Sequence, residues 1–275
     1  MENCHIGVFV TYANPQGHLF LDRALYLPQE WTSAKVRCEA AGIPEERTFA
    51  TKPQLAQQML QRAFDAGVPA AWVTGESVYG ENRSLRLWLE ANHRAHVRAV
   101  SGQEYVWRAG RPHQVKTLLA ALEAEGWCRL SAGDGSKGPR WYDWCWLPLA
   151  RPLLAAWRCW LLVRRRVSDP TELTAYVVFA PEATALATVG QVAGSRWTVE
   201  RCFEEAKGEG GLDHYEVRSW TGWYRPITLA MWAYALLTGL RAAHWSTAPP
   251  LKKRTRGSTQ GSLTAFKASR GLACR

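Results

Sequence analysis

The order of extended and helical patterns in the first 100 residues constrains the fold more than any other feature of the chain. The patterns predict a β-hairpin, a helix, a strand, a second helix and a further strand, at 6–27, 52–66, 68–74, 84–92 and 96–100. A β-β-α-β-α-β order is typical of a mixed sheet with helices packed on its faces. We therefore predict the α/β class.

The hairpin and the first helix rest on clear local patterns. Ile6, Val8 and Val10 alternate as strand residues do, and 14–17 (Asn-Pro-Gln-Gly) supplies turn-forming residues before the second extended run. Thr51 is suited to cap a helix whose apolar residues recur at helical spacing, with Pro53 near its first turn.

The pattern changes after residue 101. A helix near 113–125 is followed by a Gly- and Ser-rich stretch and by the aromatic cluster 141–146. The remaining predicted elements are two strands and two helices, at 157–168, 173–180, 182–208 and 226–243. We divide the chain into a first part of a core, an insertion or irregular lobe, a second part of the core and a basic, disordered tail, at 1–101, 102–150, 151–244 and 245–275.

The net charge of +10 points to nucleic acid, but most of it belongs to the tail. Residues 245–275 hold seven basic residues and no acidic ones. Removing these seven from the 34 basic residues leaves 27 against 24 acidic residues, a charge of +3 for residues 1–244. The charge of the whole chain is therefore weak evidence for DNA binding.

Cysteine usage and the longest apolar run bear on the compartment. The seven cysteines are scattered without a Cys-x-x-Cys pair, and no signal peptide is evident, which favours reduced thiols in a cytoplasmic protein. The longest apolar run, 226–240, is shorter than the roughly 20 residues that span a bilayer. We expect a buried helix there and no membrane partner.

Two segments carry carboxylates suited to metal chemistry. On a helix, Arg196, Glu200, Glu204 and Lys207 would share a stripe roughly 80° wide, so that a metal-binding carboxylate would stand beside phosphate-binding cations. Glu76 directly follows a predicted buried strand, where ligands gather in α/β sheets. By spacing alone, a solvated helix face and an exposed loop carboxylate remain the ordinary alternatives.

Both segments resemble blocks of one family. Arg196-x-x-x-Glu200-x-x-x-x-x-x-Lys207 resembles the latter part of the Tyr-Arg-Glu-Lys signature of DDE-type bacterial insertion-sequence transposases, and residues 211–223 resemble the block that follows it. Residues 75–80, Gly-Glu-Ser-Val-Tyr-Gly, are similar to the family's Gly-Asp-x-Val-Tyr-Gly. The resemblance covers roughly residues 2–244.

The resemblance implies a fold, a site and partners. The fold would be a ribonuclease-H-like mixed sheet with flanking helices, interrupted by an insertion before the last catalytic helix. Glu76 and Glu200 would be catalytic ligands of Mg²⁺ or Mn²⁺, and Arg196, Lys207 and Arg218 would contact DNA. The partner would be double-stranded DNA, as transposon ends and target, in a bacterial, nucleoid-associated protein. A homodimer stays open.

The chain departs from the family's pattern at the acidic positions. Glu76 stands where the family has Asp, and the family's first Asp belongs to a strand upstream of the block that begins at Glu2. Asp22 is a weak substitute. The Tyr of the signature is replaced by Ala193, and Pro226 stands where the family commonly has His. We therefore expect an N-terminally truncated, degenerate transposase with impaired cleavage and strand transfer.

Two other interpretations remain open. The chain could be a DNA-binding remnant without catalysis, which inhibits an active relative, or a hydrolase of another class that uses only Glu76 and Glu200. Salt-dependent DNA binding that survives removal of residues 245–275 would favour the first.

Overall fold

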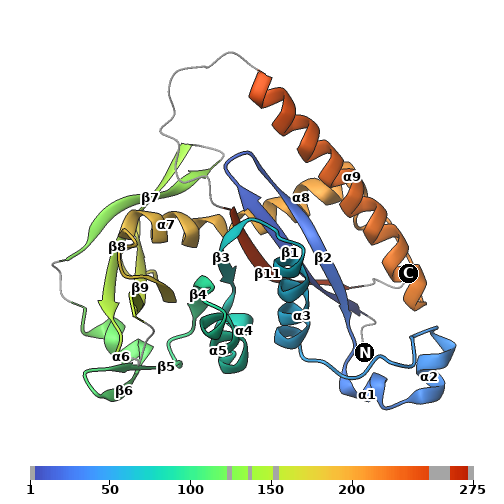
Figure 1. The fold of residues 1–275 in the computed structure, drawn as a ribbon, viewed down its shortest axis with the longest axis horizontal. Helices are drawn as coiled ribbons and strands as arrows, with labels where there is room; N and C mark the ends of the chain where they lie inside the picture. Colours follow the sequence, from blue (N-terminus) through green and yellow to red (C-terminus); the bar gives the residue numbers. More distant parts are fainter. Residues whose placement is uncertain (1–3, 123–125, 136–137, 151–154, 248–260, 272–275) are drawn as a thin grey trace. The chain divides into compact units, whose positions relative to one another are not determined.

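The computed structural model describes residues 4–122, 126–135, 138–150, 155–247 and 261–271 (Figure 1). Contacts divide the chain into unit 1, residues 1–69 and 197–275, and unit 2, residues 70–196. Each unit has its own strands and helices and is described by itself.

Unit 1 is built on three antiparallel strands with β1 in the middle. Its strands are β1 (Cys4–Asn14), β2 (Gly17–Tyr26) and β11 (Gly261–Gly271). β1 pairs with β2 on one side and with β11 on the other. The predicted hairpin is confirmed, and the Asn14 side chain accepts hydrogen bonds from the backbone N–H groups of Gln16 and Gly17, which fixes the turn.

Helices pack on both faces of these strands. They are α3 (Lys52–Asp65), α8 (Thr198–Gly210) and α9 (Trp220–Thr247), while the short helices α1 (Gln29–Thr32) and α2 (Lys35–Ala40) lie between β2 and α3 in the chain. α3 contacts β1 and β2, and Thr51 and Gln54 form the capping box that begins it. On the other face, Phe9 and Phe20 pack in one apolar cluster with Cys202, Trp223 and Tyr234 of α8 and α9.

Unit 2 is a mixed sheet of six strands in the order β3-β4-β10-β9-β8-β7. The strands are β3 (Ala70–Gly75), β4 (Ala95–Val100), β7 (Cys128–Gly135), β8 (Gly138–Pro148), β9 (Trp157–Arg166) and β10 (Leu173–Pro181). β3 and β4 run parallel, and the other neighbours that pair are antiparallel. The prediction of an α/β fold with a mixed sheet and flanking helices is therefore confirmed.

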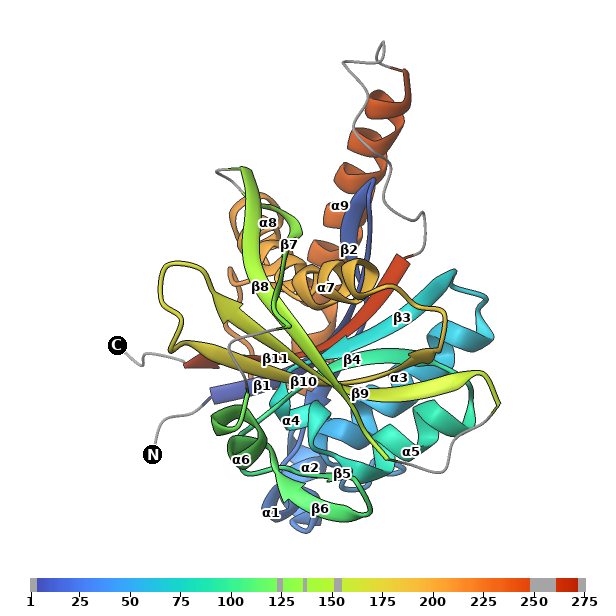
Figure 2. The same ribbon diagram turned by 90° about the vertical axis from the view of Figure 1, so that its left-hand side faces the viewer.

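The sheet of unit 2 has an apolar cluster on each face. The helices of the unit are α4 (Ser77–Gly80), α5 (Arg83–Ala91), α6 (Val115–Ala120) and α7 (Leu186–Ser195), and a separate hairpin joins β5 (Tyr105–Arg108) and β6 (Arg111–Gln114). Figure 2 shows α7 beside β7 and β8, with α6 and the β5–β6 hairpin further down. Even-numbered residues such as Trp144 and Leu162 pack with α7, whereas odd-numbered Leu161 and Val163 pack with α6.

Three sequence expectations are corrected. The stretch 102–150 is not irregular in its described parts, because it forms the β5–β6 hairpin, α6 and the two strands β7 and β8. The tail is not wholly disordered, because Gly261–Gly271 form β11. Its small polar residues resemble a linker in composition, but Ser262, Leu263 and Thr264 are buried beside β1. The other tail residues, 248–260 and 272–275, lie outside the described residues.

The third correction concerns the long helix expected at 182–208. It is two helices, α7 and α8, separated at Arg196 and Trp197. In one straight helix the apolar residues of both would share a stripe. They pack instead in different clusters, Val189 and Val192 in unit 2 and Cys202 and Ala206 in unit 1. Because the apolar periodicity continues across the break between α7 and α8, the sequence pattern alone predicts one continuous helix.

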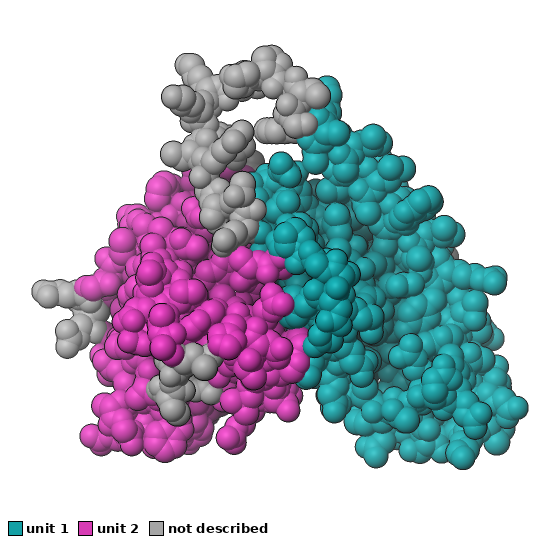
Figure 3. Space-filling view, in the orientation of Figure 1, with its two compact units in different colours: residues 1–69, 197–275 teal, residues 70–196 magenta. Residues whose placement is uncertain are grey.

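Figure 3 colours unit 1 teal and unit 2 magenta. The described cysteines Cys38, Cys128, Cys145, Cys159 and Cys202 are not in disulfides. Among the described residues, none of the helices combines the length and apolarity that a membrane crossing needs.

Candidate active-site residues

Glu76 stands at the carboxyl end of β3 in unit 2. It is the N-cap residue of the one-turn helix α4, and its backbone oxygen accepts hydrogen bonds from Tyr79 N–H at 3.0 Å and Gly80 N–H at 2.8 Å. The chain therefore turns sharply as soon as the buried strand ends. This turn holds the half-buried Glu76 at the strand end, where the sequence analysis expected it.

The turn after Glu76 is locked against β4. A Cβ atom on Gly80 would lie 1.9 Å from the backbone oxygen of Ala99, so only glycine allows this approach. The buried guanidinium of Arg98 donates a hydrogen bond to the backbone oxygen of Gly80. Arg98 is also the register partner of Gly75, the residue before Glu76. A buried cation therefore belongs to the surroundings of the candidate carboxylate.

Sequence analysis missed Arg98. Its signal was a charged residue inside the mostly apolar strand Ala95–Val100, where a buried charge is costly unless it is hydrogen-bonded. The pKa of Tyr79 also reflects the electrostatic environment of the turn after Glu76. Burial raises the pKa of its hydroxyl above the ordinary value, and the negative charge of Glu76 raises it further.

Glu200 lies in the first turn of α8 in unit 1 and is half-buried. Val199, Cys202 and Ala206 form the buried side of this helix, while Lys207 is exposed in its last turn. An anionic side chain near a helix N-terminus is favoured by the helix dipole, as is a cation near the C-terminus. Glu200 and Lys207 thus share one helix, as predicted.

Arg196 and Arg218 occupy other places. Arg196 is the residue that ends α7, in unit 2, so it does not continue the helical stripe of Glu200 and Lys207. Arg218 is exposed in the connection between α8 and α9 in unit 1. The weak candidate Asp22 is held by arginine: its carboxylate accepts two hydrogen bonds from Arg62, at 2.7 and 2.9 Å.

A polar cluster that the sequence did not predict surrounds Glu205 on α8 in unit 1. Its carboxylate accepts hydrogen bonds from the Tyr234 hydroxyl at 2.9 Å and from Arg241 at 3.3 Å, and His18 Nε2 lies 3.7 Å away. The cluster ties α8, α9 and the tip of β2 together. Glu205 is thereby engaged in structure, in contrast to Glu204, which is exposed on the same helix.

Carboxylate oxygens are the ligand type that Mg²⁺ and Mn²⁺ take, and Mg²⁺ is commonly held by one or two carboxylates together with substrate phosphates. Glu76 and Glu200 fit that chemistry by type. Among the residues that the structure describes, no group of three or more His, Cys, Asp or Glu side chains forms a metal cluster.

Residues 1–117 match the family model of the DDE superfamily endonucleases. This match supports a DDE-type nuclease or transposase. The DDE-matching segment runs from the β1–β2 hairpin into α6 and contains Glu76, its turn and Arg98. Glu200, Arg196, Lys207 and Arg218 lie beyond it. The comparison with curated proteins found no match.

Proposed function

We propose that the chain is a transposase-type DNA nuclease of the DDE group, with cleavage impaired by glutamate at position 76. The observation that carries the proposal is the position of Glu76: it lies within the DDE-matching segment, directly after a buried strand, on a turn locked by Gly80 and Arg98. The reaction would be the cleavage and transfer of phosphodiester bonds at the ends of an insertion sequence.

In this proposal Glu76 and Glu200 bind Mg²⁺ or Mn²⁺. The metal, when bound, would supply Lewis-acid activation of the attacking oxygen and of the scissile phosphate. Arg196, Lys207 and Arg218 would hold DNA phosphates. Glutamate at position 76 extends the carboxylate by one methylene relative to aspartate, and a misplacement of about 1 Å can cost ~10²-fold in rate. This is the physical reason to expect weak cleavage.

A second candidate is DNA binding without catalysis, by a remnant that inhibits an active relative. It is favoured by the same glutamate and by the arginine-rich face of unit 2 described below. A homodimer and nucleoid association stay predictions.

The proposal is tested by metal binding and by nicking. Mn²⁺ affinity is measured by calorimetry for the full chain and for Glu76→Gln, Glu200→Gln and the control Glu204→Gln, an exposed carboxylate on the same helix as Glu200. The first two variants should bind Mn²⁺ more weakly, and the control should bind like the parent. Equal Mn²⁺ affinity in all four proteins would refute the metal site.

Nicking is measured with Mn²⁺ or Mg²⁺ on DNA that carries the flanking inverted repeats. We expect little specific nicking by the parent chain and more by Glu76→Asp, which restores the shorter side chain. Efficient specific nicking by the parent would overturn the proposed impairment while leaving the nuclease assignment in place.

A further inference from the structure

One face of the unit 2 sheet carries a concentration of arginines. On this face of β8 and β9, even-numbered side chains such as Trp144 and Leu162 pack with α7. Toward one end of the two antiparallel strands, the same face carries Arg140 and Tyr142 on β8 and Arg164 and Arg166 on β9. Exposure increases along β9, from buried Leu162 to half-buried Arg164 and exposed Arg166. The face that is apolar beneath α7 therefore becomes cationic and accessible further along the same strands.

Two tyrosines connect these arginines. The Arg164 guanidinium lies over the Tyr142 ring, 4.5 Å from its centroid, and donates a hydrogen bond to Thr174 at 3.0 Å. The pKa of the Tyr176 hydroxyl is raised by burial, while the positive charges of Arg164, Arg196 and Arg140 act in the opposite direction. These three guanidinium groups therefore lie close enough to act on a single hydroxyl. Arg196 follows two residues after Gly194, whose backbone oxygen accepts a hydrogen bond from Arg140, so the end of α7 lies beside this face.

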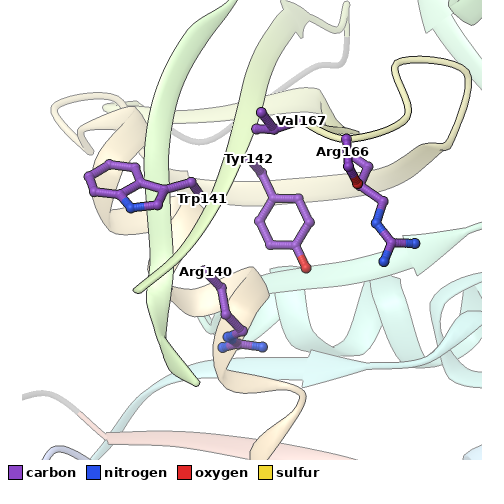
Figure 4. Close-up of a pocket in the computed structure, with 6 residues that line it drawn as sticks. Arg140, Trp141, Tyr142, Arg166 and Val167 are labelled. Carbon is purple, nitrogen blue, oxygen red and sulfur yellow. The ribbon is translucent and has the colours of Figure 1, made fainter. Parts of the chain in front are cut away.

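Arg166, the fourth arginine of this face, borders a shallow hollow together with Arg140. The hollow has a volume of about 330 Å³ and is lined by Arg140, Trp141, Tyr142, Arg166, Val167 and Ser168. In Figure 4 the Tyr142 hydroxyl points into the space between the side chains of Arg140 and Arg166, while Trp141 points away. The hollow thus presents two guanidinium groups and a hydroxyl, which are all hydrogen-bond donors.

Local anchors hold these cations in place. Arg140 donates hydrogen bonds to the backbone oxygens of Ala132 at 2.9 Å and Gly194 at 3.1 Å. Arg166 pairs with Glu172 at 2.7 Å, and both side chains of that pair are about half exposed. An ion pair this exposed contributes little to stability, so a phosphate oxygen can replace Glu172 at little cost.

The opposite face of the same strands is different. There the carboxylate of Asp143 accepts hydrogen bonds from Arg129 at 2.8 and 3.3 Å and from Arg165 at 3.2 Å. Arg165 also lies over the Trp127 ring. One carboxylate thus serves two arginines on this face. On the other face Arg166 pairs with Glu172, Arg164 donates a hydrogen bond to Thr174, and Arg140 donates hydrogen bonds to backbone oxygens.

We propose that the arginine face, Arg140, Arg164, Arg166 and Arg196, binds the phosphodiester backbone of DNA. The proposal rests on the proposed function and deepens it, because it extends the phosphate contact expected of Arg196 to three residues of β8 and β9. Guanidinium groups suit phosphate because their planar donors match its oxygens. Their spread over two strands and a helix end, around an open hollow, suits a chain of phosphates better than a single small anion.

The test is DNA binding without metal. Fluorescence anisotropy of a labelled duplex oligonucleotide is measured in EDTA over a range of salt concentrations, for the full chain and for Arg164→Gln, Arg166→Gln and the double variant. The matched controls are Arg165→Gln, between them on β9 but on the opposite face, and Arg129→Gln. Arg166→Gln removes only an exposed ion pair, so its fold should persist, and thermal unfolding checks this.

Loss of one phosphate contact should reduce the slope of log K against log salt by about 0.9 and weaken binding roughly threefold to tenfold at moderate salt. We expect this for each variant of the arginine face and not for the controls. The proposal is overturned if Arg165→Gln weakens binding as much as Arg164→Gln, or if the double variant binds like the parent.

This outcome is separable from that of the nuclease assignment. The DNA-binding assay is carried out in EDTA, so its result does not depend on the proposed metal site. If the parent binds DNA through these arginines but neither binds Mn²⁺ nor nicks, the arginine face stands and the nuclease function fails. If Mn²⁺ binding depends on Glu76 and Glu200 while arginine-face variants bind DNA normally, the reverse holds.

Discussion

The Arg98 guanidinium donates a hydrogen bond to the backbone oxygen of Gly80, and so links β4 to the turn that follows Glu76. Arg98→Met keeps much of the side-chain volume but removes this donor. Leaving a buried oxygen without its partner costs about 1–3 kcal/mol, so we expect the free energy of unfolding to fall by that amount. The turn should also loosen, and hydrogen exchange at the amides of Tyr79 and Gly80 should accelerate.

The control for this prediction is Arg83→Met, at an exposed position at the start of α5. Its unfolding free energy should stay within about 0.5 kcal/mol of the parent value. Unchanged exchange at Tyr79 and Gly80 in Arg98→Met would mean that the arginine does not hold the turn.

Gly80 itself gives a steric prediction. Gly80→Ala would place a methyl group 1.9 Å from the Ala99 backbone oxygen, and the turn would have to move away from β4. Overpacking of this kind costs about 1–3 kcal/mol, measured by urea unfolding. Gly208→Ala is the matched control, because Gly208 lies within α8 and a Cβ there meets nothing within 4 Å. That substitution should stabilise the chain by up to about 1 kcal/mol. Equal effects of the two would argue against the close approach.

Local patterns explain which parts of the fold could be predicted. Alternation in β1 and the capping residues of α3 act over a few neighbours, so the hairpin and the helix were predicted close to their observed bounds. The same holds for the turn at Asn14, whose side chain bonds its own backbone neighbours. Glu76 after β3 followed from the end of an apolar run in the same way.

Long-range contacts explain what was missed. β11 forms a strand because it pairs with the edge of β1, which is far away in the sequence. The paired residues Thr11 and Thr264, for example, are 253 residues apart. The composition of β11 gave no sign of this partner. The turn between α7 and α8 follows from two separate cores, and the burial of Arg98 follows from its packing against α4. No local pattern contains this information.

β11 is testable through Leu263, whose side chain is fully buried and which pairs with Tyr12 in register. Leu263→Ala should lower the free energy of unfolding by about 2–4 kcal/mol, because a buried leucine leaves a cavity. Val36→Ala is the control, since Val36 is 82% exposed, and it should change stability by no more than about 0.5 kcal/mol. If the two substitutions had equal effects in urea unfolding, the pairing of β11 with β1 would be wrong.

The Glu205 cluster predicts a dependence of stability on pH through His18. Burial lowers the pKa of His18 from its ordinary value of 6.5, and the positive charges of Arg201 and Arg241 lower it further, although Glu205 acts in the opposite direction. The ion-pair distance of 3.7 Å to Glu205 would favour a charged imidazole. Burial is the largest influence, so the folded chain favours neutral His18.

The unfolded chain therefore takes up a proton first as the pH falls. Stability is highest above 6.5 and decreases as the pH falls through 6.5 toward the lower pKa of the folded chain. His18→Gln removes this group, so its unfolding free energy in urea should decrease less over the same pH range than that of the parent. His214→Gln is the control, because the His214 side chain is 78% exposed, and it should keep the parent's pH dependence. A parent-like dependence in His18→Gln would show that His18 does not titrate on unfolding, and the carboxylates would then have to account for the whole slope.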